Sequence, residues 1–171
     1  MKQVKGDIFN QVADAICIPT NGYVTKAGKA VMGAGIAKIA KEKFKDIDSA
    51  LGKHLNKKGN IPTIIYETPK YKIVSFPVKP EFVKNNGENV ISKAKDRFKL
   101  GDIVPGWAAK ATYDLINESL CHLVKLTDDN KWEKVIIPFV GCGNGELDRK
   151  TVSSMLNILL DDRFILIDYE Q

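Results

Sequence analysis

Short apolar runs alternate with amphipathic segments along most of the chain, and this alternation constrains the fold more than any other feature. Brief runs rich in β-branched residues are typical of buried strands, whereas apolar residues spaced three and four apart are typical of helices. Strands are expected from Val4 and at 15–19, 135–138 and 164–167, and helices at 35–44, 107–126 and 151–160. Such an order predicts an α/β domain with a sheet between helices.

Two further apolar runs, 63–66 and 71–76, flank a turn at Pro69-Lys70. We expect them to form an antiparallel hairpin, which makes the sheet a mixed one. The next stretch, 77–106, is polar and contains three prolines and a charged segment, 92–99, for which we expect a short helix. We interpret 77–106 as a long excursion from the core, and excursions of that length are commonly functional or mobile.

Composition supports one compact domain over residues 1–171, since 44% of the residues are apolar and 27% are charged. No signal-like N-terminus and no stretch of ~20 apolar residues is present, so we expect a soluble, cytoplasmic protein with no membrane partner. The three cysteines lack the spacing of a zinc site or a disulfide framework. We therefore expect reduced thiols, no metal and no cofactor.

The net charge of +5 comes almost wholly from lysine, because only 3 of the 26 basic residues are arginine. Nucleic-acid readers rely on bidentate arginine, whereas scattered lysines usually form a solvated surface that favours anions in general. Direct nucleic-acid binding is therefore an open alternative that the composition does not favour.

Two glycine-rich loops follow apolar strands, and each precedes a helix. They are Met32-Gly33-Ala34-Gly35-Ile36-Ala37 and Gly141-Cys142-Gly143-Asn144-Gly145-Glu146-Leu147. Glycine lets successive backbone N–H groups turn toward one point, and a helix N-terminus adds partial positive charge. The pair predicts a diphosphate held from both sides; the alternative is two tight turns without a ligand.

Neither loop matches a standard nucleotide signature. Lys38 stands where a dinucleotide-binding fingerprint requires its third glycine, and the chain contains no Gly-x-x-x-x-Gly-Lys-Ser/Thr motif. These absences argue against a kinase or a dehydrogenase.

Three polar residues at strand ends are further candidates. Asp7 follows the first strand and can accept a proton from an adenine amine, with the Ile8 backbone completing the contact, or it can simply form a turn. Asn21 can contact a ribose or close a turn. Lys79 lies between two prolines at the end of a strand; a neutral lysine can attack carbonyl-like carbons, although most lysines are solvated.

Taken together, these pieces resemble the macrodomain family of ADP-ribose-binding modules. The matching segments are Gly6-Asp7-Ile8-Phe9, 13–18, the first glycine-rich loop with its helix, and 137–148, in the expected order over nearly the whole chain. The Met-Gly-Ala-Gly-Ile-Ala form is similar to the branch with terminal ADP-ribose protein glycohydrolase and the antitoxin macrodomain that removes ADP-ribose from DNA.

The resemblance implies a three-layer α/β/α fold with a mixed central sheet and an ADP-ribose site. It implies that Asp7 and Ile8 take the adenine, that both loops hold the diphosphate, and that Lys79 faces the distal ribose. Tyr169 is a candidate for stacking on adenine, or a solvent-exposed residue near the terminus. We expect a monomer that binds ADP-ribose or ADP-ribosylated protein or nucleic acid.

Three departures bear on the reaction. Gly145 stands where the protein-directed glycohydrolase has an acidic residue, and Asp148 is expected at most to cap the following helix. The segment 20–31 and the excursion 77–106 are longer than the family usually has.

Three hypotheses follow. The first is a hydrolase that removes ADP-ribose from a macromolecule, or an acyl or phosphate group from an ADP-ribose derivative, with Lys79 as the catalytic residue. The second is a non-catalytic reader of ADP-ribose. The third is a single-stranded nucleic-acid binder with Phe82, Phe98 and Trp107 as stacking rings.

Overall fold

The computed structural model describes residues 1–170, in which six strands form one central sheet with the order β1-β8-β7-β2-β4-β3. Its strands are β1 (Lys2–Gly6), β2 (Ala15–Asn21), β3 (Thr63–Glu67), β4 (Lys72–Lys79), β7 (Val135–Pro138) and β8 (Phe164–Tyr169). Neighbouring strands are parallel except β3, which pairs with β4 in antiparallel register. The predicted hairpin and the mixed sheet are therefore confirmed.

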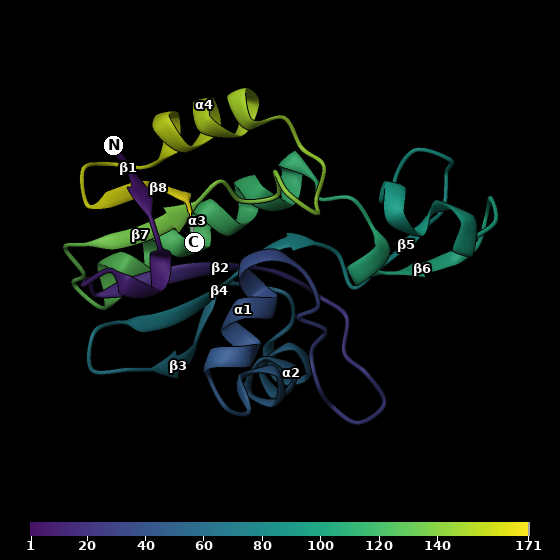
Figure 1. Ribbon diagram of the computed structural model, residues 1–171, viewed down its shortest axis with the longest axis horizontal. Coiled ribbons are helices and arrows are strands. Elements are labelled where there is room, and N and C mark those ends of the chain that lie inside the picture. The colour runs from purple at the N-terminus through teal and green to yellow at the C-terminus, as the bar shows by residue number, and fades with distance from the viewer. Residues whose placement is uncertain (171) are drawn as a thin grey trace.

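Two pairs of helices cover the two faces of the sheet (Figure 1). On one face lie α1 (Gly35–Lys43) and α2 (Ile47–Lys58), which pack on a buried cluster that includes Ile16, Ile18 and Ile73. On the other lie α3 (Tyr113–Asp129) and α4 (Arg149–Leu159), which pack on a second cluster. Side chains alternate between the faces of a strand, so β2 and β4 feed both cores and the molecule has three layers.

The sequence reading missed α2 and placed the start of α3 too early. Three apolar residues spaced four apart (Ile47, Leu51 and Leu55) bury one narrow stripe of α2, and no long apolar run marks it. The helix expected at 107–126 begins only at Tyr113, because Thr112 caps it by accepting the Leu115 N–H (3.2 Å). Residues 109–111 are held extended by tertiary hydrogen bonds instead.

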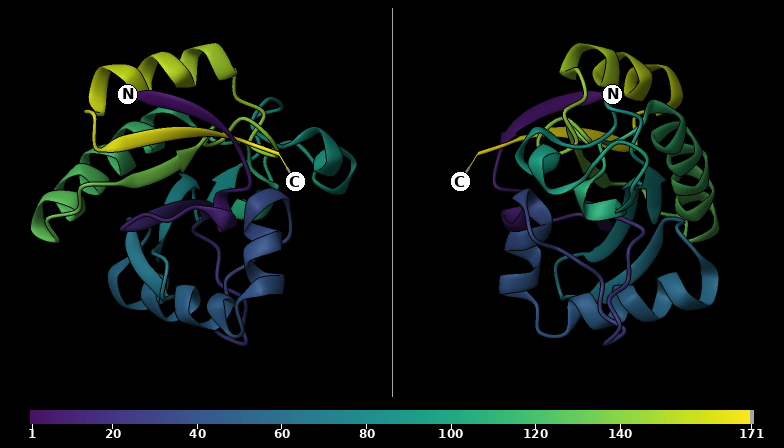
Figure 2. Two further views of the ribbon diagram at one scale, coloured as in Figure 1. Left: turned by 60° about the vertical axis from the view of Figure 1, so that its left-hand side comes forward. Right: turned by 90° about the vertical axis from the view of Figure 1, so that its right-hand side faces the viewer.

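Most of the excursion forms a side lobe, residues 80–109, that projects from the sheet (Figures 1 and 2). It contains β5 (Phe82–Lys84) paired with β6 (Ile103–Pro105), and a 3-10 helix at Ser92–Arg97. A separate small core stabilises it, formed by Val90, Ile91, Ala94, Val104 and Ala108. Residues 77–79 belong to β4 instead of the excursion, so the lobe starts directly at the end of a central strand.

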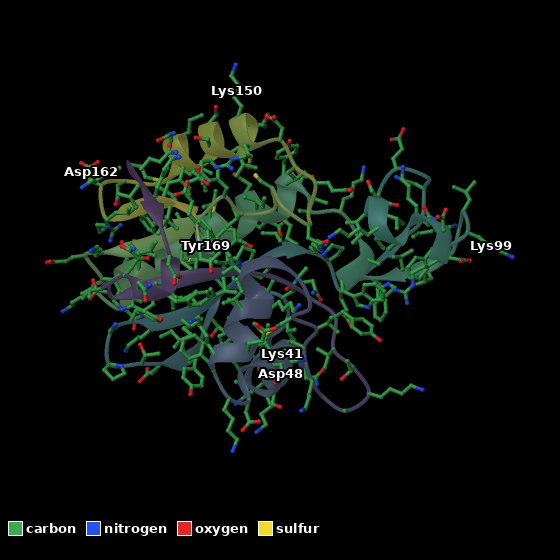
Figure 3. All side chains as sticks on the ribbon, in the orientation of Figure 1. Lys41, Asp48, Lys99, Lys150, Asp162 and Tyr169 are labelled. Atoms are coloured by element: carbon green, nitrogen blue, oxygen red, sulfur yellow. The ribbon has the colours of Figure 1, made fainter. Side chains whose placement is uncertain are left out.

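The long segment between β2 and α1 is docked on α2 rather than loose. Gly52 of α2 has no room for a side chain because the Gly28 carbonyl oxygen lies against it. Ala30 N–H donates to the Asp48 carbonyl oxygen (3.0 Å), and Lys41 pairs with the Asp48 carboxylate (3.7 Å; Figure 3). These contacts fix the approach of the chain to the first glycine-rich loop. Among the described residues, no helix is long and apolar enough to cross a bilayer.

Candidate functional site

The adjacent strands β2 and β7 lead to helices on opposite faces of the sheet. The chain runs from β2 to α1 on one face and from β7 to α4 on the other (Figure 1). In open α/β sheets a crevice forms outside the carboxyl ends of the strands at such a switch point. Both predicted loops lie there, since the first precedes α1 and the second precedes α4.

A cavity of about 530 Å³ occupies this crevice. Its size is typical of small-ligand sites. Its walls come from the strand ends, the two glycine-rich loops and the side lobe. The lining residues are Pro19, Thr20, Asn21, 31–37, Val78, Lys79, Ile91, Lys93, Ala94, Arg97, Trp107, Pro138, Phe139, 141–145, Arg149, Asp168 and Tyr169. The structure therefore brings Asn21, Met32, Gly33, Ala34, Gly35, Ile36, Lys79, Gly141, Cys142, Gly143, Asn144, Gly145 and Tyr169 to one cavity.

The first loop ends where α1 begins. Gly35 is the first residue of α1 and has a φ of +54°, a conformation that glycine adopts at little cost. Ala34, at the N-cap, offers no side-chain acceptor to the first turn. The N–H groups of this turn thus carry partial positive charge beside the cavity, where an anionic ligand group can accept from them.

The second loop is closed by its own backbone. Leu147 N–H donates to the Gly141 carbonyl oxygen (3.0 Å), and Gly141 has a φ of +74°. A Cβ atom on Gly145 would collide with the same carbonyl oxygen, so only glycine fits at that position. Ala111 N–H donates to the Gly145 carbonyl oxygen (3.0 Å), which ties the loop to the chain that leads into α3.

Lys79 is a buried lysine at the end of β4, with 5% of its surface exposed. Its Nζ donates to the Trp107 carbonyl oxygen (3.3 Å). Removal from water disfavours the ammonium form and lowers the pKa of Lys79 to about 8, against a smaller opposing effect of the Glu146 carboxylate. About a tenth of the amine is therefore neutral at pH 7, far more than for a solvated lysine, and a nucleophilic lysine requires this neutral form.

The remaining ionic side chains of the lining are mainly cationic. Lys93 and Arg97 come from the side lobe and Arg149 from the start of α4. Arg149 donates to the Asp168 carboxylate (2.8 Å) and lies over the Phe139 ring (3.9 Å), while Arg97 lies over the Trp107 ring (5.1 Å). Three cations and Lys79 against one carboxylate give the cavity a positive balance that suits a phosphate-bearing ligand.

Asn21 and Tyr169 both line the cavity, but Asn21 is held by hydrogen bonds and Tyr169 by an aromatic contact. Asn21 already bonds within its own segment, accepting the Tyr23 N–H (3.0 Å) and donating to the Val31 carbonyl oxygen (2.9 Å). Tyr169 lies at the end of β8 (Figure 3), in edge contact with Phe9 (6.3 Å between ring centroids). Its ring is therefore held at the rim of the cavity by the segment that follows β1.

Four predicted contact residues do not line the cavity. The Asp7 carboxylate accepts the Phe9 N–H (2.8 Å), and Ile8 is fully buried in the core beneath α1 and α2. Gly6 pairs with Tyr169, so Asp7 stands immediately beside the rim. Leu147 packs on the core beneath α3 and α4.

Glu146, the fourth, turns toward the side lobe. Its carboxylate accepts the Ser92 N–H (2.9 Å) and pairs with Lys110 (3.8 Å), and its backbone φ is +61°. The hydrogen bond from Ser92, aided by Lys110 and Lys95, lowers the pKa of Glu146. The side chain thus links the second loop to the lobe.

Two neighbouring residues have structural explanations. Asp148 caps α4, as predicted, by accepting the Thr151 N–H (2.7 Å). Burial raises the pKa of the Cys142 thiol to about 11, which keeps it protonated at neutral pH and makes it a poor nucleophile. Over residues 1–170, no group of three or more metal-ligating side chains is found.

Sequence reasoning missed the wall that the side lobe provides and the polar residue Thr20. Lys93 and Arg97 lie in a segment that has no local motif, and only the folding of the lobe brings them to the cavity. Arg97 is one of three arginines, which was the one available signal. The expected strand ended at residue 19, whereas Thr20 lies within β2.

The architecture is that of a macrodomain: six mostly parallel strands between two helical layers, with glycine-rich loops at the switch point. The similar solved structures agree. The macrodomain of Mycobacterium tuberculosis DarG has a TM-score of 0.69 at 20% identity, over 97% of this chain and 95% of that one. The macrodomain of Thermus aquaticus DarG has a TM-score of 0.70 at 20% identity, over 99% and 97%.

A third similar structure is Thermosipho africanus DarTG in complex with ADP-ribose. Its TM-score is 0.69 at 18% identity, over 98% of this chain but only 41% of that larger one. No protein-family model matches the sequence, and no curated protein matches it either. The structural likeness therefore establishes the macrodomain fold of the chain.

Proposed function

We propose that the chain binds ADP-ribose in this cavity and hydrolyses the bond between the distal ribose and the group attached to it. The observation that carries the proposal is the meeting of two backbone phosphate cradles and one buried lysine in a single cavity. The ADP-ribose bound in the structurally similar DarTG supports the choice of ligand.

The strand order gives the ligand a direction. Asp7 and Tyr169 lie at the ends of β1 and β8, the two loops follow β7 and β2, and Lys79 ends β4. Adenine at the β1 and β8 side would place the diphosphate between the loops and the distal ribose beside Lys79. The binding energy of the adenosine and diphosphate groups would then hold the ribose against the amine.

In the proposed reaction, the neutral amine of Lys79 forms a bond to C1″ of the distal ribose, and the bonds from C1″ to the leaving group and to the ring oxygen break. The leaving group and the ring oxygen each take one of the two protons that the amine gives up, and an imine between Nζ and C1″ remains. Water then hydrolyses the imine, which returns the amine and releases ADP-ribose. Because Lys79 is buried, charge that develops beside its amine is poorly screened by water, and the loop dipoles act on it strongly.

The decisive experiment compares Lys79→Ala with Lys53→Ala, a control on the exposed surface of α2. We expect Lys79→Ala to lower single-turnover hydrolysis at least ~100-fold, because the nucleophile is removed. Calorimetry should show an ADP-ribose Kd within about threefold of the unchanged protein, because the other contacts remain. Retained turnover would exclude Lys79 from the mechanism.

Substrates of three kinds should be assayed: ADP-ribosylated peptide, ADP-ribosylated DNA and O-acetyl-ADP-ribose. Binding of ADP-ribose without product from any of them would make the protein a reader. Oligonucleotide binding that falls steeply with salt and is not displaced by ADP-ribose would favour the nucleic-acid alternative.

A further inference from the structure

Thr20, the residue before the last in strand β2, has a buried hydroxyl group without a protein partner. The residue is 6% exposed, and it lines the cavity. Only one other buried side-chain nitrogen or oxygen atom in residues 1–170 lacks a hydrogen-bond partner: the side-chain amide oxygen of Asn60, a residue that does not line the cavity. An unpaired buried hydroxyl destabilises a fold, so such a group on a residue that lines a ligand site is a candidate for pairing with the ligand.

The register of the sheet places Thr20 one step from the pairing partner of Lys79. Thr20 pairs with Pro77 and Asn21 pairs with Lys79, with a shift in register between the two pairs. Ile16 and Ile18 of β2 and Ile73 of β4 face the core beneath α1 and α2. Thr20 continues the alternation of Ile16 and Ile18 along β2, and both Thr20 and Lys79 line the cavity at the ends of neighbouring strands.

The Thr20 hydroxyl can also form a kind of hydrogen bond that the backbone N–H groups of the loops cannot. Backbone N–H groups can only donate, and the Lys79 ammonium likewise only donates, whereas a threonine hydroxyl both donates and accepts. Sugar hydroxyl groups need acceptors as well as donors. The Asn21 side-chain oxygen already accepts the Tyr23 N–H and Asp168 is paired with Arg149, whereas the Thr20 hydroxyl has no partner and is well suited to supply an acceptor.

We propose that Thr20 is a substrate-positioning residue whose hydroxyl forms a hydrogen bond with a hydroxyl group of the distal ribose and holds C1″ against the Lys79 amine. This inference rests on the proposed function, since it requires ADP-ribose in the cavity. It concerns the ribose end alone, and predicts no effect on the adenosine diphosphate part of the ligand.

The test is a calorimetric comparison of ADP-ribose with ADP, which lacks the distal ribose. Thr20→Val keeps the branched shape and removes the hydroxyl. We expect its Kd for ADP-ribose to rise about 5- to 10-fold, the usual effect of one lost hydrogen bond, and its Kd for ADP to stay within about twofold. Thr20→Ser, which retains the hydroxyl, should restore most of the affinity.

Thermal unfolding supplies a second measurement that a merely structural role would not reproduce. Thr20→Val removes an unpaired buried hydroxyl, so its Tm should stay level or rise by a few °C. The matched control is Thr127→Val on α3, whose fully buried hydroxyl donates to the Leu123 carbonyl oxygen (2.8 Å). That control should lower the Tm and leave both Kd values unchanged.

The outcomes separate the two proposals. If the unchanged protein binds no ADP-ribose, the proposed function fails. If it binds ADP-ribose but Thr20→Val binds equally well, the role of Thr20 fails alone. If Thr20→Val weakens the affinity for ADP and for ADP-ribose by the same factor, or lowers the Tm, Thr20 stabilises the loops instead of positioning the ribose.

Discussion

The Lys79 side chain places an amine where its charged form is unfavourable, and its titration should be visible in the reaction. Burial lowers the pKa of Lys79 to about 8, so the neutral amine increases as the pH rises through that value. We expect single-turnover rates at saturating substrate to rise with pH between about 6.5 and 9, with half of the maximum near 8. A flat profile would contradict attack by this amine.

At the residue scale, sequence reasoning identified positions more readily than environments. The resemblance to macrodomains pointed to Lys79 at the end of a strand, but the environment of its amine depends on Trp107 in the side lobe, whose carbonyl oxygen accepts from Nζ. Asp7 shows the reverse case: its place after β1 was predicted, while the local acceptor role toward Phe9 arises from a short 3-10 helix. Partners distant in sequence decide such environments.

At the element scale, Glu146 connects two walls of the cavity, and its removal should loosen them. Glu146→Ala eliminates the acceptor of the Ser92 N–H and the partner of Lys110. We expect faster hydrogen exchange at Ser92 and neighbouring amides, and an ADP-ribose Kd about 3- to 10-fold higher, because Lys93 and Arg97 are then less well placed. Glu146→Gln can still accept from Ser92 and should change both quantities less.

Charge gives a further readout of the same pair of variants. The Glu146 carboxylate raises the pKa of Lys79, in opposition to burial. Both variants should therefore move the pH–rate profile to lower pH, whereas Glu118→Ala on the exposed face of α3 should not. Unchanged exchange at Ser92 in Glu146→Ala would show that the lobe is held by its other contacts.

The periodicity of apolar residues predicted most strands and the helices with broad apolar faces, because the burial of these elements is visible in the residues of each segment alone. Val135–Pro138 is buried on both faces, and in Phe164–Ile167 only Ile165 is partly exposed, which agrees with the continuous apolar runs seen in the sequence. The start of α3 was wrong because tertiary bonds hold residues 109–111: Ala111 N–H donates to Gly145 and Thr112 N–H to Val78. Such pairings are absent from any local window of sequence.

At the scale of the whole molecule, the cavity lies where three separately packed parts meet. One core lies beneath α1 and α2, a second beneath α3 and α4, and a third within the side lobe. The two glycine-rich loops belong to the first two parts, and Lys93 and Arg97 belong to the third. The ligand would contact all three, so binding should stabilise the arrangement as well as each part.

The buried amine also makes the stability of the whole fold depend on pH. In the unfolded chain Lys79 has the ordinary pKa of 10.5, and in the folded protein burial lowers its pKa to about 8. Between these values the unfolded state binds more protons than the folded state. The contribution of Lys79 to the free energy of unfolding therefore increases as the pH rises from about 8 to about 10.5. Below about 8 the folded state bears the full cost of burying the charge, at most about 3 kcal/mol.

Lys79→Met, which fills similar space without a charge, should remove that cost. We expect the variant to be more stable than the unchanged protein by about 1–3 kcal/mol at neutral pH, and the difference to shrink toward zero as the pH approaches about 10.5. Urea unfolding at several pH values measures it, with Lys53→Met as the exposed control. A variant that is equally stable or less stable at neutral pH would show that the Lys79 ammonium is well solvated in the folded protein, and the proposed nucleophile would then lack the environment that activates it.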